Sequence, residues 1–161
     1  VAAGRRAAAT GGKLAEAETI CRRVLEKAPE NAEAYHLLGI IAHQSGNLGH
    51  ALDHMRRAVA LAPNIALYHA NLGKMCRLAK RIDEAIAEGK RALELQPDYP
   101  DAMSNLGIAY YEKDDFAKAL AHYDRAIALR PNFAEALSNR GNALRALKRL
   151  DEAIVAYRRA L

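Results

Sequence analysis

The sequence predicts an all-α solenoid, in which an antiparallel pair of helices is repeated and stacked. Proline recurs every 34 residues, at Pro29, Pro63, Pro97 and Pro131. Glycine recurs with the same spacing, at Gly39, Gly73, Gly107 and Gly141. Two alanine series share this phase, one from Ala51 to Ala153 and the other from Ala58 to Ala160. A fixed period of this length is typical of proteins built from one repeated structural unit.

The first half of each repeat has the spacing of an amphipathic helix. In the first complete repeat, small and apolar residues follow the i, i+3, i+4, i+7 pattern from Tyr35 to Ala42. After a break at residues 45–47, a second stripe runs from Ala51 to Leu61 and ends before Pro63. Since Gly39 lacks a side chain, we expect it to let the two helices approach closely beside Ala51.

Proline separates one repeat from the next because it lacks an amide donor and restricts the residue before it. We expect the polar residue after each proline to cap the next helix, namely Asn64, Asp98 and Asn132. The chain then divides into one array with a partial repeat at 1–31, complete repeats at 32–65, 66–99 and 100–133, and a partial repeat at 134–161.

The first partial repeat predicts a helix over residues 2–9, with Gly11–Gly12 as the connection to the next helix. The chain begins without methionine and stops before a fifth proline could appear. We therefore expect it to be part of a longer protein.

This pattern resembles the tetratricopeptide repeat family along the whole chain. Tyr35, Leu38 and Gly39 occupy the family's aromatic, leucine and glycine places, and Ala51 and Met55 occupy its second-helix places. The resemblance implies a right-handed superhelix with the first helices lining its concave groove. Equivalent residues in the later repeats are His69-Leu72-Gly73, Met103-Leu106-Gly107 and Leu137-Arg140-Gly141 for the first helix, and Ala85-Gly89, Ala119-Tyr123 and Ala153-Tyr157 for the second.

Two positions depart from the family pattern. Gly89 replaces a large side chain, which should leave a gap for Met103 or Tyr110 to fill. Arg140 replaces a core leucine, and we expect its stem to lie on apolar surface with the guanidinium reaching Asp124 or Asp151.

Composition excludes several classes of function. The formal net charge is +5, but arginines alternate with acidic residues and form no continuous basic stripe, so nucleic-acid binding is not expected. No stretch is long and apolar enough to span a membrane. The only cysteines, Cys21 and Cys76, fall at buried places in non-adjacent repeats, which predicts two reduced thiols and favours the cytoplasm.

Catalytic and cofactor motifs are missing from the pattern, so we expect neither enzyme activity nor a cofactor. His50 and His54 are one helical turn apart, as in zinc-binding helices, but no third ligand is identifiable and we predict no metal site.

The groove contains a second regular series, Asn71, Asn105 and Asn139, also 34 residues apart. A primary amide donates and accepts hydrogen bonds, so it can pair with the peptide backbone of an extended partner. The series is similar to the asparagine ladder of O-linked N-acetylglucosamine transferases, where it binds substrate polypeptide. The alternative is that these asparagines only bridge neighbouring helices of the scaffold.

We therefore predict a peptide-binding groove. Its candidate residues are Asn71, Asn105, Asn139, Lys74, Arg77, Tyr111, Asn142, Arg145, His36 and His43. The basic members should favour acidic segments, whereas Glu33, Asp101 and Glu135 at the groove edge should oppose this preference.

The predicted function is a non-catalytic scaffold for protein–protein interaction. The alternative is a substrate-recruiting arm of a larger enzyme, such as a glycosyltransferase with its catalytic domain outside this sequence. End-to-end self-association is also expected, through Ile154, Tyr157 and Leu161 of the last helix.

Overall fold

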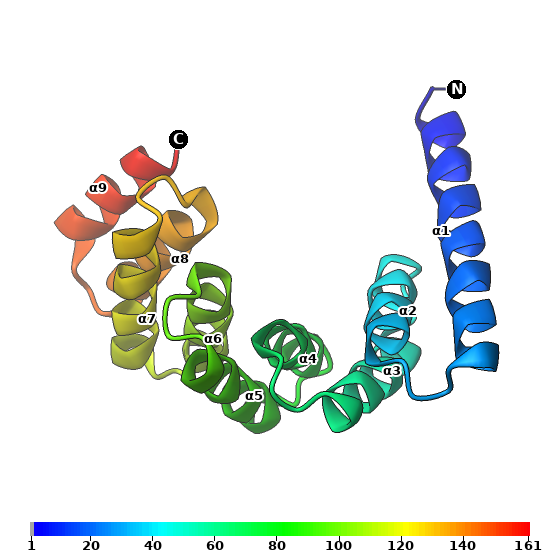
Figure 1. Cartoon of the computed structure of the whole chain (residues 1–161). Coiled ribbons are helices and arrows are strands. Elements are labelled where there is room, and N and C mark those ends of the chain that lie inside the picture. Colours follow the sequence, from blue (N-terminus) through cyan, green and yellow to red (C-terminus); the bar gives the residue numbers. More distant parts are fainter. Residues whose placement is uncertain (1) are drawn as a thin grey trace. The chain divides into compact units, whose positions relative to one another are not determined.

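The computed structural model describes residues 2–161, with side chains from residue 12 onward, and this part of the chain contains nine α-helices and no strand (Figure 1). The prediction of an all-α solenoid is confirmed. The helices are α1 (Ala2–Lys27), α2 (Ala32–Gln44), α3 (Leu48–Leu61), α4 (Ala66–Leu78), α5 (Ile82–Leu95), α6 (Pro100–Glu112), α7 (Phe116–Leu129), α8 (Ala134–Ala146) and α9 (Leu150–Ala160).

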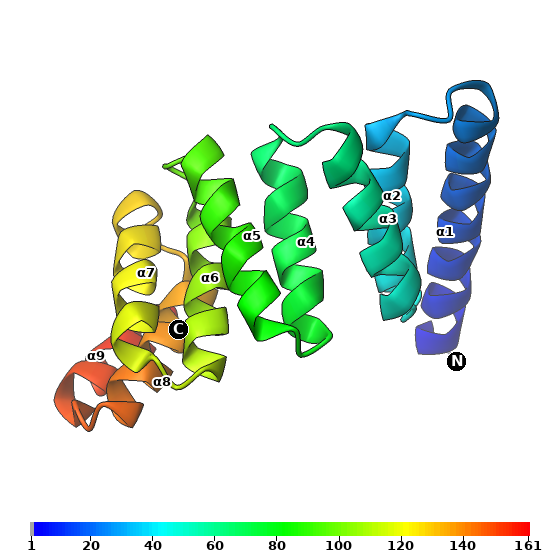
Figure 2. The same ribbon diagram turned by 90° about the horizontal axis from the view of Figure 1, so that it is seen from below.

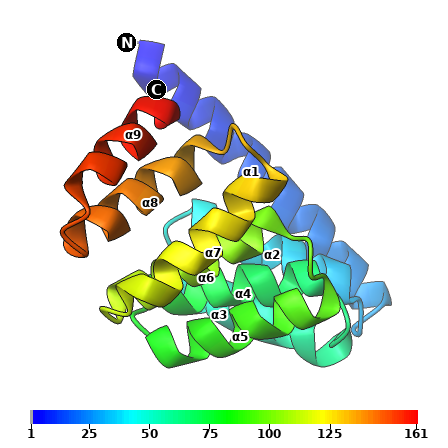
Figure 3. The same cartoon turned by 90° about the vertical axis from the view of Figure 1, so that its left-hand side faces the viewer.

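The helices form two compact units, and the division falls within α4, between Tyr68 and His69. In the first unit α2 packs against α3 and also against α1 (Figure 2). In the second unit α6 pairs with α7 and α8 with α9, while α5 packs on α6 and α7 on α8 (Figure 3). The helices in these contacts therefore each bury one face against a sequence neighbour, as a stacked array requires.

The turn inside each helix pair places one residue in the left-handed region. Gly46 has φ +77°, and Lys80, Asp114 and Lys148 each have φ 60°. The residue that follows each left-handed residue donates its backbone N–H to the carbonyl oxygen five positions earlier in the chain. Asn47, for example, donates to Ala42 at 2.8 Å. This is the C-terminal motif that ordinarily selects glycine, and only the first complete repeat provides one.

The predicted helix caps are wrong by one residue. The cap position lies two residues after proline, where Asn31 accepts a 2.8 Å hydrogen bond from the Ala34 amide. In two later repeats this position holds Tyr99 and Phe133, which make no side-chain cap bond. Asp98 and Asn132 lie instead in the preceding turn, because the chain needs one more residue before it enters the helix.

The predicted connection at Gly11–Gly12 is also wrong, because α1 continues through both glycines as one helix. Each glycine costs about 1 kcal/mol of helix propensity relative to alanine. The surrounding segment is rich in alanine, which is the strongest helix former, and a continuous helix results.

Close approach at glycine fixes the packing of three helix pairs. A Cβ on Gly107 would lie 2.6 Å from the ring of Tyr123, and one on Gly141 would lie 2.5 Å from the ring of Tyr157. Gly39 faces Met55 in the same way, at 2.9 Å, so the contact partner is the large second-helix residue rather than Ala51. Only glycine leaves room for this side chain.

In the repeat at 66–99, Gly89 occupies the position of the large second-helix residue, and the glycine of the first helix therefore makes a different contact. Gly73 lies against the backbone of α5, with the Ala85 carbonyl 3.2 Å from the position of a Cβ. The gap above Gly89 is filled by Leu106, at 3.2 Å, and not by Met103 or Tyr110 as predicted. Leu106 comes from the helix that packs directly on α5.

Three smaller predictions can be compared with the structure. Arg140 donates its Nε hydrogen to Asp124 at 2.5 Å, which confirms one of the two expected partners. Cys21 and Cys76 are both buried and neither forms a disulfide bond, as predicted. Tyr157 is not part of an exposed end face, because it packs on Gly141 and donates a 2.8 Å hydrogen bond to Asn142.

The left-handed turn residues generate a stability prediction. Lys148→Gly should raise the free energy of unfolding by roughly 0.5 to 1 kcal/mol, because glycine adopts positive φ without the steric cost of a Cβ. The matched change Gly46→Ala should lower it by about 1 kcal/mol. Denaturant unfolding of both variants measures this, and a loss of stability in Lys148→Gly would contradict the assigned turn.

Candidate functional site

A polar pocket of about 310 Å³ lies on the first helices of the second unit. Its residues come from α4, from α6 and the residue before it, and from α8 and the residue before it. They are Asn71, Lys74, Arg77, Tyr99, Asp101, Ser104, Asn105, Phe133 and Glu135. Consecutive repeats therefore contribute to one site, as expected for a surface lined by the first helices.

The pocket brings together four of the residues predicted from the sequence, Asn71, Lys74, Arg77 and Asn105. The two asparagines come from equivalent positions of α4 and α6, each two residues before the glycine of its repeat. Asn139 has the equivalent position on α8 and is half-buried, but it does not line this pocket.

One charge at the pocket is neutralised by an ion pair between α4 and α6. Arg77 donates to Glu112 at 2.7 Å, and both side chains are largely buried. Lys80 donates to the other oxygen of the same carboxylate at 3.1 Å. Burial acts to raise the pKa of Glu112, but these hydrogen bonds outweigh it and the pKa is lowered. Arg77 is thus held in place by a carboxylate of its own chain.

A second charge is neutralised at the start of α6. Arg130 makes two hydrogen bonds to Asp101, at 3.0 and 2.7 Å, in a bidentate pair. The hydrogen bonds from Arg130 lower the pKa of Asp101 despite the opposing effect of partial burial. The same guanidinium lies 4.5 Å from the centre of the Phe133 ring. Asp101 is therefore less available to a partner than the sequence suggested.

Several other polar groups of the pocket lack partners among the described residues. Lys74, Asn105 and Glu135 make no hydrogen bond or ion pair there. Ser104 is only 2% exposed, and its hydroxyl has no hydrogen-bond partner. The Nε of Arg77 is also buried without one. Buried polar groups are ordinarily satisfied, so their concentration around one pocket indicates a site that is incomplete without a ligand or ordered water.

The other predicted residues lie outside this pocket. The ring of Tyr111 contacts that of Phe116 at a centroid distance of 5.1 Å, and Asn142 accepts the hydrogen bond from Tyr157. Arg145 is exposed near the end of α8. In the first unit, His43 is half-buried. His36 is 5% exposed against Tyr68, with ring centroids 4.5 Å apart, and burial lowers its pKa.

Besides Asp101 and Glu135, which were expected at the groove edge, three lining residues were not among the candidate binding residues, namely Tyr99, Ser104 and Phe133. Tyr99 and Phe133 each lie two residues after a repeat proline, and this equivalence is a signal that the sequence offers. Ser104 gave no such signal, because its lack of a partner emerges only when the neighbouring helices are in place.

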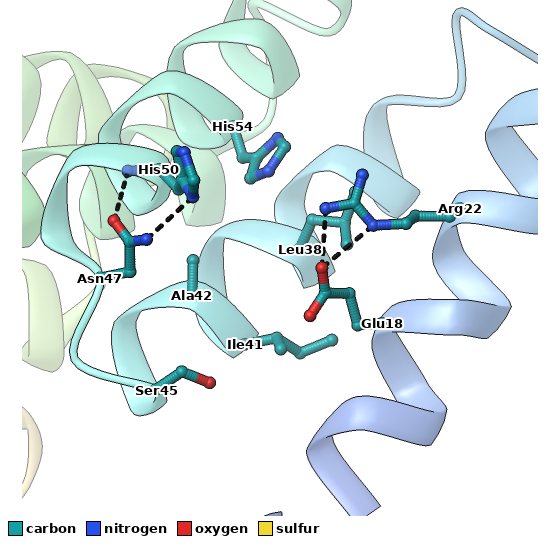
Figure 4. A pocket seen from close by; sticks show the side chains of 9 residues that line it. All are labelled: Glu18, Arg22, Leu38, Ile41, Ala42, Ser45, Asn47, His50 and His54. Atoms are coloured by element: carbon teal, nitrogen blue, oxygen red, sulfur yellow. Dashed lines mark hydrogen bonds and ion pairs between the residues drawn. The ribbon is translucent and has the colours of Figure 1, made fainter.

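A second pocket, of about 240 Å³, lies in the first unit between α1 and the α2–α3 pair (Figure 4). Glu18 and Arg22 form an ion pair at 2.7 Å on one side, and His50 and His54 lie on the other. Burial lowers the pKa of His54, and the positive charge of Arg22 lowers it further. His54 is therefore held in its neutral form.

The two histidines are not arranged for a metal ion in this pocket. The Nδ2 of Asn47 lies 2.9 Å from Nδ1 of His50, and Oδ1 of Asn47 accepts the His50 amide as the cap of α3. Because the amide nitrogen donates, His50 carries its proton on Nε2, the atom that would otherwise face a ligand. No group of three or more potential metal-binding side chains was found in the described part of the chain.

Comparisons with known proteins agree with the geometry. Two family models of the tetratricopeptide repeat match the chain. One matches residues 3–66 and 104–161, and the other matches residues 63–132. A crystal structure of MamA is 27% identical, with a TM-score of 0.84, covering 94% of this chain and 88% of that one. A further MamA structure is 28% identical, with a TM-score of 0.82, covering 94% of this chain and 83% of that one.

A crystal structure of PilW, described as a widely conserved type IV pilus biogenesis factor, shares the fold at 23% identity. Its TM-score is 0.85, and the alignment covers 94% of this chain and 70% of that one. No match was found among curated proteins. Among the described helices, none has the length and apolar character that crossing a membrane would require.

The Glu112 ion pairs generate a prediction for the pH dependence of stability. The lowered pKa means that this stabilisation is complete above the ordinary value of 4.5 and is lost as the pH falls through the lower folded-state value. Glu112→Gln should destabilise the protein by about 1 to 3 kcal/mol at pH 7. It should also reduce the stability lost between neutral pH and about pH 3.

Urea unfolding at a series of pH values measures both effects. The exposed change Glu94→Gln is the control, because its i, i+3 pair with Arg91 at 3.0 Å lies on a solvated face and should contribute little. Equal pH dependence in wild type and Glu112→Gln would contradict the assigned role.

Proposed function

Since the chain belongs to the tetratricopeptide repeat family, we propose that it is a non-catalytic scaffold that binds an extended segment of a partner protein. The family supports a role in protein–protein interaction. The binding surface proposed here follows the first helices of the second unit, α4, α6 and α8. The repeats at 32–65, 66–99 and 100–133, with the partial repeats around them, are the proposed building units of the array.

The observation that supports this surface most strongly is the pocket shared by α4, α6 and α8. It combines amides from two equivalent positions with charged and hydroxyl groups that have no partner among the described residues. An extended peptide offers one donor and one acceptor per residue, and amide side chains complement both. Such recognition does not depend on the partner's side chains, so it suits a scaffold that binds the backbone of a partner segment.

The spacing of the asparagines also fits an extended chain. Packed helices lie about 10 Å apart, and an extended chain advances about 3.3 Å per residue. One asparagine can therefore meet every third residue of a bound segment. Asn139 would extend the contact beyond the pocket onto α8.

The asparagine series leads to a direct test. Changing Asn71, Asn105 and Asn139 together to alanine should weaken a bound peptide by about 1 kcal/mol per lost hydrogen bond, or roughly tenfold or more in total. The helical content should remain unchanged because none of the three is a core residue. Peptides selected from a random linear library, then titrated by calorimetry, provide the measurement.

The matched control is Asn64→Ala with Asn132→Ala, since both residues are exposed in turns. This variant should bind the selected peptides as wild type does. Unchanged affinity in the triple variant would mean that the asparagines serve the scaffold only.

We further propose that α9 mediates end-to-end association between copies of the chain. Ile154 and Val155 are 48% and 55% exposed, and Leu150 and Leu161 are exposed beside them. Neighbouring apolar side chains of this kind are unusual on a monomer surface. Tyr157 is not part of this surface, because it packs inside the α8–α9 pair.

Association through α9 should depend on these side chains. Ile154→Glu with Val155→Glu should reduce the mass measured by light scattering at high protein concentration, because the added charges make burial unfavourable. Leu129→Glu, an exposed change on α7, is the control. A wild-type chain that stays monomeric at all concentrations would contradict the proposal.

A further inference from the structure

The charges around the α4–α6–α8 pocket divide into two kinds. Arg77 is neutralised by Glu112, and Asp101 is neutralised by Arg130. Lys74 and Glu135 also line the pocket but have no ion-pair partner among the described residues. The pocket therefore presents one free positive charge, on α4, and one free negative charge, on α8.

Only one of the two free charges is explained by the fold. Glu135 lies in the first turn of α8, where a carboxylate interacts favourably with the helix dipole. Lys74 has no such explanation, because it lies in the interior of α4 and is half-buried in the pocket. Beside it are Asn105, the buried Ser104 hydroxyl and the Nε of Arg77, which are all potential donors without a partner.

We propose that the pocket selects partner segments that carry an acidic residue facing α4 and a basic residue facing α8. The acidic side chain pairs with Lys74 at the donor-rich side of the pocket, and the basic side chain pairs with Glu135. This inference rests on the proposed function, because it assigns side-chain specificity to the same peptide-binding surface. It concerns residues other than the asparagine series, so the two can fail separately.

The dimensions of an extended chain set the separation of the two side chains. Packed helices lie about 10 Å apart and an extended chain advances about 3.3 Å per residue, so a segment that reaches from α4 to α8 places several residues between them. A pocket of about 310 Å³ can receive both, with Tyr99 and Phe133 supplying apolar surface for their aliphatic stems. A segment with only acidic residues would fit less well, because Glu135 repels a second carboxylate.

The order of preference among ligands follows from the same charges. A zwitterionic pair of side chains satisfies both free charges, whereas a neutral segment satisfies neither. Oppositely charged groups contribute more to partner choice than to affinity, so the effect should be seen mainly as selectivity.

The test is selection from a library of short linear peptides of random sequence, using the whole chain as bait. Wild type should enrich peptides with an acidic and a basic residue separated by several positions. Lys74→Glu should remove the preference for the acidic residue, and Glu135→Lys should remove the preference for the basic one. Each charge reversal should weaken the best wild-type peptide about fivefold or more, and less so in high salt.

Matched controls reverse the same charges elsewhere in the second unit. Lys90→Glu changes an exposed lysine on α5, and Asp151→Lys changes an exposed acid in the first turn of α9. Both should leave the selected sequences and their affinities unchanged. The Asp151 variant also reproduces the helix-dipole cost of Glu135→Lys.

The outcomes separate this inference from the proposed function. Peptides that bind and depend on the asparagines, but show no charged pair, would overturn the selectivity and leave the scaffold function standing. Selection that responds equally to Lys74→Glu and Lys90→Glu would overturn it as well. If the library yields no binder, both proposals are overturned.

Discussion

The structure depends on the contact between a glycine of the first helix and the large residue of the second. Gly107 accepts the ring of Tyr123 within a distance that a Cβ would forbid, and this fixes how α6 is rotated about its axis. Successive residues of a helix are 100° apart, so a residue two positions before the glycine lies about 200° away. Asn105 is therefore placed on the opposite side from α7. The same relation places Asn139 opposite the Gly141–Tyr157 contact.

The second unit also contains the exception to this rule. With Gly89 in place of the large residue, Gly73 meets the backbone of α5 and Leu106 fills the space from α6. The contact of Leu106 with Gly89, which joins two repeats, thus replaces part of the contact between the two helices of one repeat. Arg77 adds a polar connection to the same pair of repeats, through Glu112. Packing and electrostatics therefore join α4 to α6, the two helices that supply the asparagines of the pocket.

Sequence periodicity was sufficient to predict the helix pairs and the glycines at which paired helices approach closely. It failed where two local preferences compete, as in α1, where alanine-rich sequence outweighs Gly11 and Gly12. It also failed for a contact between the two ends of one repeat. Asp101 was expected to oppose acidic ligands, but Arg130 neutralises it from 29 residues away in sequence. The buried Ser104 hydroxyl likewise requires three-dimensional information.

Packing positions and pocket positions are under different constraints within the repeat. Gly39, Gly73, Gly107 and Gly141 are identical because each must admit a neighbouring helix. The position of Asn71 one repeat earlier is instead occupied by Leu37, which is 42% exposed beside Ile20 at an apolar pocket of about 200 Å³. This position is outside the buried core, so the side chain can differ without disturbing the fold. For this reason membership of the family determines the architecture of the chain, whereas the proposed choice of partner is assigned to residues such as Lys74 and Glu135, which the repeat pattern leaves unspecified.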